Sequence, residues 1–346
     1  MRAEGTRCRE RVPVKSPAII FPEPGRAVVD EVPIPDLRDD EVLVDIQYSA
    51  LSPGTERWCL TGKLDVPDEP PVAFPHLPGY QAAGVVREVG SAVLGLSPGD
   101  RVFSRNCRAP DGWNGSWWGG HAGVHVAPAD SVIKLPDTVS LREASGLLLA
   151  QVGYNGASRP PVTPGDVAVV IGEGLVGQYA AQVLRYRGAR VILSGLVPER
   201  LDMAARYSAD EVFDASRRGD LAGYVRAHHP GGIAIAVDTA SAARTVRMAA
   251  GLLARNGHLV MNGFYPPPES MVDWHWLRGR ELTLYCPNSR TRARLEATLG
   301  LIAEGAMKVE ELVTHELALA DAPRAYAMLL DPAAPFLGVV IRWTEP

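Results

Sequence analysis

The chain has 346 residues, of which 46% are hydrophobic and 22% charged, and its formal net charge is −5. That composition is typical of a soluble globular protein with a substantial core, and the length predicts two domains. The negative balance gives no basis for nucleic-acid binding. No apolar run reaches the roughly 18 residues that a bilayer-spanning helix needs, so we expect no membrane association.

The cysteines show neither a disulfide framework nor a metal-binding cluster. Cys8, Cys59, Cys107 and Cys286 are far apart and form no CxxC pair. The first residues, MRAEGTRCRERVPVK, are charged and lack the apolar core of a signal peptide. We therefore expect a cytoplasmic protein with reduced cysteines.

The first 150 residues have the pattern of a β-rich domain. Short apolar runs such as EVLVDIQYSAL and AAGVVREVG are separated by turns rich in Pro and Gly, which favours strands over long helices. SPGD at 97–100 is a turn that leads into the strand RVFS. Residues 140–157 are richer in Ala and Leu, and predict a helix.

From Asp166 onward, strands and helices alternate. VAVVIG and ARVILSG are strand-like, and the helix-like segments QYAAQVLRYRG and PERLDMAARYS follow them. The alternation continues as far as ELTLYC, which predicts βαβ units and a parallel sheet. After Pro287 we expect a helix, then a short β/α mixture ending in the strand FLGVVIRW.

Between the first strand and helix of this region lies the glycine motif GEGLVG, Gly172 to Gly177. The motif alone is weak evidence, but it follows a strand and opens a helix, as it does in dinucleotide sites. Gly172 can adopt a backbone conformation that other residues resist, Gly174 leaves the backbone open to a pyrophosphate, and Gly177 lets the helix approach the strand. The N–H groups of the first helical turn, including Leu175 and Val176, attract phosphates. We predict dinucleotide binding.

The residues at the end of the second strand indicate which dinucleotide binds. NAD sites usually place a carboxylate there to bond the ribose 2′-hydroxyl. Here Gly195 stands at that position, with no carboxylate. Ser194 could donate a hydrogen bond to a 2′-phosphate and Arg200 could supply positive charge, although Arg200 can also be read as a solvated helix residue. The sequence therefore favours NADP, with NAD as the alternative.

Four markers along the chain resemble those of the medium-chain dehydrogenase/reductase superfamily: Pro53-Gly54-Thr55-Glu56, Pro78-Gly79-Tyr80-Gln81, Gly99-Asp100-Arg101-Val102 and Gly172–Gly177. The resemblance covers nearly the whole chain. It implies an α/β protein with a GroES-like β-rich catalytic domain at residues 1–156 and a Rossmann doubly wound parallel sheet at 157–288. Residues 289–346 would return to the catalytic domain.

Zinc-dependent members of that superfamily hold the metal with a Cys, a His and a third Cys, Asp or Glu. In this sequence the corresponding positions are Pro53, Tyr80 and Leu149. Gln81 stands where those members have a Glu next to the histidine. A catalytic zinc needs three protein ligands. The four-cysteine structural zinc lobe is also missing, since Cys107 stands alone in that region. We therefore expect no zinc.

SPGTE together with PGY further resembles a zinc-free subgroup that includes 2-desacetyl-2-hydroxyethyl bacteriochlorophyllide dehydrogenase-like proteins. This resemblance implies a zinc-independent NAD(P)-linked oxidoreductase. The expected reaction interconverts a secondary alcohol and a ketone on a ring-containing biosynthetic intermediate. The small-molecule substrate would be its main partner, and the family resemblance suggests a homodimer.

Four residues are candidates for the chemistry. Tyr80 stands where the zinc histidine would be, so its phenol could face the reacting oxygen, and Thr55 matches the proton-relay hydroxyl of the family. Glu56 matches an acid that orients a zinc ligand, and could orient Tyr80 or hold a loop. His121 follows a tryptophan-rich loop and could line a pocket. The plainer alternative for Tyr80 is a packed aromatic residue.

Further residues are expected at the substrate and the cofactor. The tryptophan-rich loop is either a substrate-facing lid or a packing cluster, and the next helix could reach the same pocket; the candidates are Trp113, Trp117, Trp118, Gln151 and Tyr154. Ligands of parallel sheets collect at the carboxyl ends of the strands. That rule gives the remaining cofactor candidates, Thr239, Ala240, Gly263, Phe264 and Asn288.

Two other functions fit the same sequence. The first is an NADPH-dependent enoyl- or quinone-type C=C reductase, whose enolate needs only hydrogen bonds for stabilisation. The second is a non-catalytic NADPH-binding sensor, because a lost metal site makes loss of catalysis conceivable.

Overall fold

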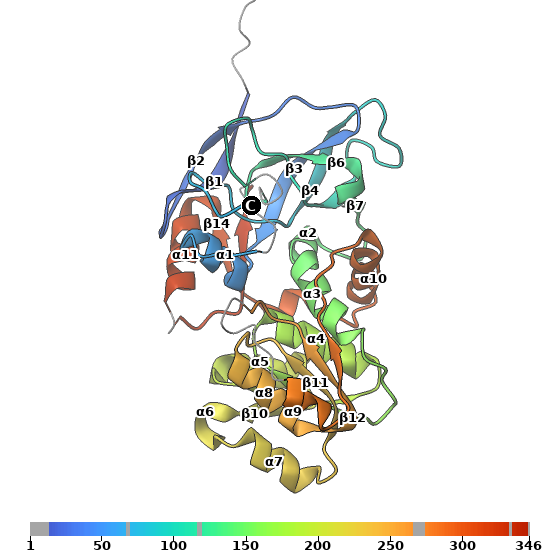
Figure 1. The fold of residues 1–346 in the computed structure, drawn as a ribbon. Helices are drawn as coiled ribbons and strands as arrows, with labels where there is room; N and C mark the ends of the chain where they lie inside the picture. The colour runs from blue at the N-terminus through green and yellow to red at the C-terminus, as the bar shows by residue number, and fades with distance from the viewer. Residues whose placement is uncertain (1–13, 67–69, 116–119, 266–273, 332–333, 345–346) are drawn as a thin grey trace, which may run out of the picture.

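The computed structural model describes residues 14–66, 70–115, 120–265, 274–331 and 334–344. Two halves are stacked in it, each built around its own sheet (Figure 1). One half is β-rich and contains both ends of the described chain, and the other has helices packed around a parallel sheet. The predicted α/β fold with a GroES-like and a Rossmann-like part is confirmed.

The β-rich half is organised around a seven-stranded sheet with the order β14-β15-β3-β4-β5-β7, in which β6 also pairs with β3. Its strands are β3 (Glu41–Ala50), β4 (Ala82–Val89), β5 (Arg101–Ser104), β6 (Val124–Pro128), β7 (Val132–Lys134), β14 (Val313–Ala318) and β15 (Gly338–Arg342). A separate antiparallel hairpin is formed by β1 (Lys15–Glu23) and β2 (Arg26–Pro33). Central strands such as β3 are buried along most of their length, as a strand with neighbours on both edges and cover on both faces should be.

The other half is a six-stranded sheet in the order β10-β9-β8-β11-β12-β13. Its strands are β8 (Val167–Ile171), β9 (Arg190–Gly195), β10 (Glu211–Asp214), β11 (Ile233–Asp238), β12 (Leu253–Met261) and β13 (Thr283–Tyr285). All neighbouring strands in it are parallel. The strand order reverses between β8 and β11, and such a reversal opens a crevice at the carboxyl ends of the strands.

Helices cover both halves and connect them. The α-helices in the described residues are α1 (Pro53–Leu60), α2 (Leu141–Ala144), α3 (Leu147–Ala157), α4 (Leu175–Tyr186), α5 (Pro198–Tyr207), α6 (Ala215–Arg218), α7 (Leu221–His228), α8 (Ala243–Leu252), α9 (Trp274–Arg278), α10 (Arg292–Ala303) and α11 (Ala322–Leu330). No helix in the described ranges is both long enough and apolar enough to cross a membrane.

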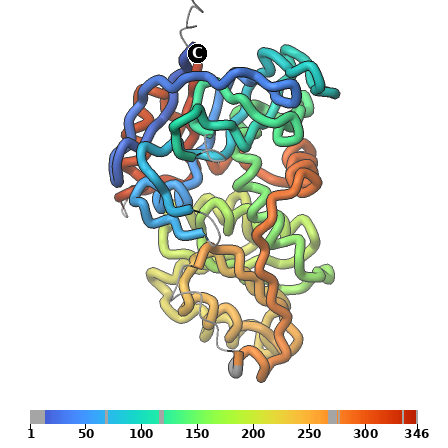
Figure 2. The backbone as a smooth tube through the Cα atoms, turned by 45° about the horizontal axis from the view of Figure 1, so that its top comes forward, coloured from blue at the N-terminus to red at the C-terminus, as the bar shows by residue number. Residues whose placement is uncertain are grey.

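The chain passes between the halves twice. It leaves the β-rich half through α3 and returns through α10, and these two helices pack against each other. Figure 2 shows the returning segment running from the Rossmann-like half back to the β-rich half. There β15 pairs antiparallel with β3, so the last strand joins the sheet of the β-rich half. The domain boundaries expected from the sequence stay a prediction.

Candidate active site

The site begins at α1, whose first turn faces Tyr80. Pro53 is the first residue of this helix, a position that suits proline because it lacks an N–H. The Ser52 side chain makes no cap to the helix; instead its Oγ accepts a hydrogen bond of 2.6 Å from the Tyr80 hydroxyl. Tyr80 also makes a side-chain hydrogen bond with Thr55. The phenol and two aliphatic hydroxyls therefore form one connected group.

Tyr80 is only 5% exposed. Burial and then the negative charge of Glu56 raise the pKa of its phenol to about 12, against the opposing effects of Ser52, Arg290 and Thr55. At neutral pH the phenol stays protonated, and it can donate or accept a hydrogen bond.

Behind this group, Glu56 accepts three hydrogen bonds. Its Oε1 accepts from the Ser52 backbone N–H at 2.7 Å, and its Oε2 accepts from the Tyr326 hydroxyl at 2.6 Å and contacts His121 Nε2 at 3.0 Å. The carboxylate is buried. It therefore links α1 to α11 and to the loop at 121, and it holds the helix start that presents Ser52 and Thr55.

The hydrogen bonds fix the tautomer of His121. The Trp343 indole N–H can only donate, and it lies 2.8 Å from Ser49 Oγ. The Ser49 hydroxyl is then free to donate to His121 Nδ1 at 2.8 Å, which leaves the proton on Nε2 to be donated to Glu56. With both nitrogens bonded and only 1% of its surface exposed, His121 lines no open pocket. This placement differs from the pocket-lining position considered from the sequence.

Glycines allow the loop that carries His121 to lie against the Tyr80 segment. A Cβ on Gly79, whose φ is +82°, would lie 2.4 Å from His121 Cδ2. A Cβ on Gly120 would lie 2.5 Å from the Tyr80 backbone nitrogen. Both contacts are closer than any side chain tolerates, so these two positions require glycine.

Gln81 connects the site to α3. Its Oε1 accepts hydrogen bonds of 3.1 Å from the backbone N–H groups of Leu148 and Leu149, which are free at the start of a helix. Leu149 packs in the same hydrophobic cluster as Tyr80. Pro53, Tyr80 and Leu149, which the sequence analysis expected at the three zinc-ligand positions, thus lie together. Across the described ranges, no three His, Cys, Asp or Glu side chains gather closely enough to hold a metal ion.

Two polar side chains of α3, Gln151 and Asn155, contact the chain just before α10. Gln151 on α3 is fully buried, its Nε2 lies 3.4 Å from the Ser289 carbonyl oxygen, and its Oε1 has no partner among the described residues. The neighbouring Asn155, not predicted, donates to the same carbonyl at 3.1 Å. Tyr154 is half-buried and packs against the main hydrophobic cluster. The Gln151 oxygen is therefore a buried acceptor without a partner among the described residues.

Two arginines that were not predicted from the sequence, Arg290 and Arg105, bring positive charge towards this part of the molecule. The charge of Arg290 opposes the rise in the pKa of the Tyr80 phenol. Arg105 follows β5, and its buried Nε has no hydrogen-bond partner among the described residues. Burial, and then the nearby charge of Arg290, lowers the pKa of Arg105. Of these two cations, Arg290 is the one whose charge acts on the Tyr80 phenol, where it favours negative charge on a neighbouring oxygen.

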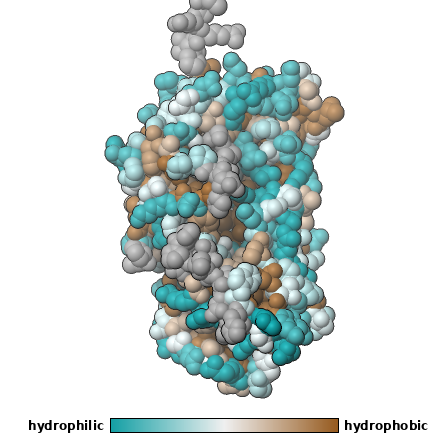
Figure 3. Space-filling view, viewed as in Figure 1, coloured by the Kyte–Doolittle hydropathy of each residue, from teal (hydrophilic) through white to brown (hydrophobic). Residues whose placement is uncertain are grey.

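An aromatic contact joins the two halves. Trp58 of α1 and Phe264, beyond the end of β12, meet edge to face with ring centres 6.2 Å apart. Phe264 is 36% exposed. Apolar surface is visible at the junction of the two halves in Figure 3. This junction therefore offers aromatic faces to an apolar or ring-shaped ligand.

The tryptophan-rich loop is described only in part. Trp113 packs on a small cluster that includes Ile20, Leu77 and Ala122, which matches the packing alternative. Trp117 and Trp118 lie outside the described residues.

The glycine turn fits a dinucleotide pyrophosphate. Gly172 has φ +113°, and a Cβ on it would lie 2.3 Å from Thr239 Oγ1. A Cβ on Gly177 would lie 1.9 Å from the Gly172 carbonyl oxygen, whereas a Cβ on Gly174 would meet nothing within 4 Å. The backbone beside Gly174 is therefore open. The partly buried Leu175 and Val176 begin α4, whose first turn has no side-chain cap.

The other cofactor candidates are placed around this crevice with different exposures. Thr239 and Ala240 follow β11 directly beside Gly172, and a Cβ on Gly263 would lie 2.3 Å from Ser241 Oγ. Asn288 is exposed after β13. Ser194 is buried, and Arg200 Nε donates to the Phe336 carbonyl oxygen at 2.7 Å. Arg200 is thus directed towards the C-terminal segment.

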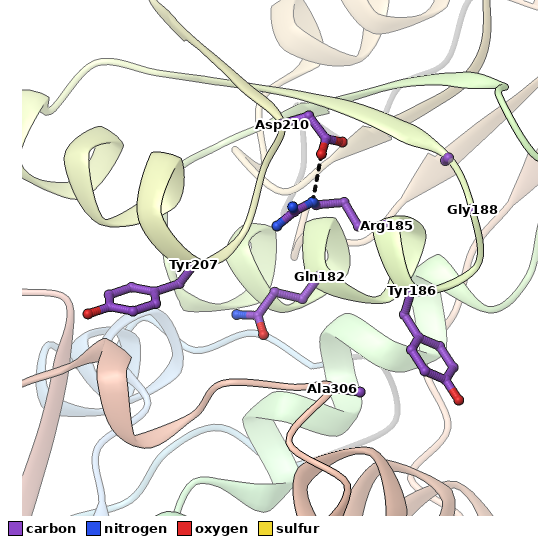
Figure 4. A pocket seen from close by; sticks show the side chains of 8 residues that line it. Gln182, Arg185, Tyr186, Gly188, Tyr207, Asp210 and Ala306 are labelled. Atoms are coloured by element: carbon purple, nitrogen blue, oxygen red, sulfur yellow. Dashed lines mark hydrogen bonds and ion pairs between the residues drawn. The ribbon is translucent and has the colours of Figure 1, made fainter.

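A surface depression of about 380 Å³ lies elsewhere, at the C-terminal end of α4 (Figure 4). Its lining residues are Gln182, Arg185, Tyr186, Gly188, Ala189, Tyr207, Asp210 and Ala306. Arg185 pairs with Asp210 across it at 2.9 Å. The glycine turn is at the opposite end of the same helix, so this depression is separate from the site.

Comparison with known families agrees with the geometry. Residues 38–137 match the alcohol dehydrogenase GroES-like domain, and residues 176–304 match the zinc-binding dehydrogenase family. The chain belongs to the zinc-type alcohol dehydrogenase-like group of the medium-chain dehydrogenase/reductase superfamily, and it is an oxidoreductase of that type.

Individual relatives are distant but cover most of the chain. A Neosartorya fischeri protein named "Probable D-xylulose reductase A" is 27% identical over 321 residues, which are 86% of this chain and 88% of that protein. An Escherichia coli oxidoreductase of unknown specificity superposes with a TM-score of 0.85 at 24% identity, over 96% of this chain and all of the other. A Sinorhizobium meliloti protein described as a zinc-binding dehydrogenase and bound to NADP has a TM-score of 0.80 at 23% identity, over 95% and 100% of the two chains.

Proposed function

We propose that this protein is a zinc-independent, nicotinamide-linked oxidoreductase that interconverts a secondary alcohol and a ketone on a ring-containing biosynthetic intermediate. The observation that carries the proposal is the group at the former metal position. A buried, protonated phenol, Tyr80, is hydrogen-bonded there to Ser52 and Thr55, while Pro53 and Leu149 offer no metal ligand. Hydroxyl hydrogen bonds would thus replace the metal in polarising the carbonyl.

We assign separate roles in the reaction to the residues of this site. Tyr80 would bond the reacting oxygen, and Thr55 or Ser52 would pass the proton, since all three hydroxyls are connected. Glu56 and His121 would act as positioning residues, because their own polar atoms are bonded to each other and to the framework. When bound, the nicotinamide supplies or accepts the hydride. Arg290, whose charge acts on the Tyr80 phenol, would stabilise developing negative charge.

Support for a nicotinamide cofactor comes from the open backbone at Gly174 and from the Sinorhizobium meliloti relative, which binds NADP. Support for a ring-shaped substrate comes from Trp58 and Phe264 at the junction of the halves. The homodimer and the cytoplasmic location stay predictions.

Metal analysis and a substrate panel test the proposal directly. Freshly purified, active protein is expected to contain no stoichiometric zinc and to turn over cyclic ketones with reduced nicotinamide cofactor. Consumption of the cofactor with enones but not with saturated ketones would instead favour the C=C reductase. Tight cofactor binding with no turnover of either class would favour the sensor.

Replacing Tyr80 by Phe tests the proton donor. The variant Tyr80→Phe keeps the packing and loses the hydroxyl, so kcat should fall by about 100-fold or more while cofactor affinity stays the same. The measurement is steady-state kinetics beside a cofactor titration. Unchanged kcat would remove Tyr80 from the mechanism.

A further inference from the structure

The glycine turn carries a carboxylate that the proposed function does not use. Glu173 stands between Gly172 and Gly174, and β8, which leads into this turn, runs parallel to β9 with Ile171 paired to Ser194. The turn after β8 therefore lies beside the end of β9. That end is Gly195, where NAD sites usually carry the carboxylate for the ribose 2′-hydroxyl.

The Glu173 side chain occupies the space that a side chain at position 195 would need. A Cβ on Gly195 would lie 2.6 Å from Glu173 Oε2 and 2.7 Å from both Glu173 Cβ and Cδ. Gly195 has an extended strand conformation, so its backbone does not require glycine. The close approach of Glu173 is what excludes a larger residue. The structure thus places a carboxylate at the usual strand end, the end of β9, but the turn after β8 supplies it.

This carboxylate is available to a ligand. Within the described residues, the Glu173 side chain makes no hydrogen bond or ion pair, and only its backbone oxygen is engaged, by Gln178 Nε2 at 3.2 Å. Ser194 and Arg200, which the sequence suggested as ligands of a 2′-phosphate, are less well placed to bind one. Ser194 is buried, and the Arg200 guanidinium is bonded to the Phe336 carbonyl and lies 5.3 Å from the centre of the Phe336 ring.

We propose that Glu173 selects the cofactor: its carboxylate accepts the ribose 2′-hydroxyl of NAD(H), and the same charge repels the 2′-phosphate of NADP(H). The inference rests on the nicotinamide linkage of the proposed function and reverses the preference for NADP drawn from the sequence. That preference was based on the absence of a carboxylate after β9. The carboxylate comes instead from Glu173, in the turn after the neighbouring strand β8.

Cofactor affinity measured without substrate tests the proposal. Energy transfer from tryptophan to the bound dihydronicotinamide gives dissociation constants for NADH and NADPH. NADH should bind the native protein more tightly, by about tenfold or more, since a hydrogen bond to a charged group is involved. Glu173→Gln should weaken NADH and strengthen NADPH, so that the ratio of the two constants moves towards one.

A matched control separates a local effect from net charge. Asp202 is exposed on α5, and Asp202→Asn removes the same charge without touching Gly195. This variant should keep the native ratio. An equal change in Asp202→Asn and Glu173→Gln would overturn the proposal.

Moving the carboxylate gives a second, independent test. Gly195→Asp alone would crowd two carboxylates together and should weaken both cofactors. The double variant Glu173→Gly/Gly195→Asp removes the Glu173 Cβ that lies 2.7 Å from the new Cβ and returns a single carboxylate to the strand end, so it should recover the preference for NADH. Circular dichroism checks that each variant is folded.

The binding results distinguish failure of the role of Glu173 from failure of the proposed oxidoreductase function. Tighter binding of NADPH by the native protein, or an unchanged ratio in Glu173→Gln, overturns the role of Glu173 and leaves the oxidoreductase standing. Binding of neither cofactor overturns the nicotinamide linkage, and this inference with it.

Discussion

Around Tyr80, the direction of each hydrogen bond separates groups that can react from groups that hold them. Glu56 accepts from a backbone N–H, a phenol and an imidazole, so its oxygens are committed. Tyr80 instead shares its hydroxyl with Ser52, another hydroxyl, which can both donate and accept. Protons can be exchanged along such a pair without leaving a buried charge, and this is why the chemistry is assigned to the hydroxyls.

A second buried histidine gives a prediction for pH dependence. His125 lies between Ser104 Oγ at 3.0 Å and the Gly120 carbonyl at 3.2 Å, and burial lowers its pKa to about 4. Between the ordinary value of about 6.5 and about 4, the unfolded chain takes up a proton that the folded chain does not. Stability should therefore fall as the pH drops through this window, by about 2 kcal/mol at pH 5 from this group.

Thermal midpoints at pH 7.5 and pH 5 measure this effect. Carboxyls such as Glu41, whose pKa is lowered by its hydrogen bond from Arg108, change stability in the same direction, so the comparison is made between variants. His125→Gln should show a smaller difference between the two pH values than the native protein. His228, exposed on α7, gives the control His228→Gln, which should keep the native difference. Equal differences in all three proteins would contradict the assignment.

At the scale of an element, the turn between β8 and α4 combines tight packing with one open position. A Cβ on Gly177 would collide with the Gly172 carbonyl oxygen, whereas Gly174, with φ −71°, has room for a Cβ. Gly174→Ala should therefore leave the thermal midpoint nearly unchanged. It should weaken cofactor binding by at least about tenfold, because the methyl group stands where the pyrophosphate approaches the backbone.

The same titration in a control variant checks this prediction. Gly300 lies in the interior of α10 with nothing within 4 Å of its Cβ position, so Gly300→Ala should bind cofactor like the native protein. Native affinity in Gly174→Ala would mean that the cofactor does not approach this turn.

For the whole molecule, the last described residues complete the first half. Trp343 donates from its indole to Ser49, across 294 positions of sequence, and Ser49 in turn bonds His121. Trp343→Phe removes the donor and keeps most of the packing. The thermal midpoint should fall, by an amount corresponding to about 1 kcal/mol.

Trp274 offers the matched control. It lies on α9 and is 68% exposed, so Trp274→Phe should leave the thermal midpoint unchanged. If Trp343→Phe is equally without effect, the C-terminal return contributes no hydrogen bond of consequence to the site.

The fold was predictable because local pattern and architecture agree. Alternating strands and helices from Asp166 predict a parallel sheet, and GEGLVG in that context predicts its ligand-binding turn. The family markers at Thr55, Tyr80 and Gln81 placed the candidate site in the β-rich half. None of these inferences required contacts between distant residues.

Side-chain neighbours, in contrast, were decided only by tertiary structure. The partners of Tyr80 and Glu56 include Ser52, His121 and Tyr326, which come from three separate segments. The carboxylate beside Gly195 belongs to Glu173, 22 positions earlier, because parallel strands bring the two ends together. By itself the sequence determined the sheet and the glycine turn, and the residue types at Pro53, Tyr80 and Leu149 led to the prediction of a site without zinc. Which polar groups meet depends on how distant strands and helices pack, and no local pattern records that.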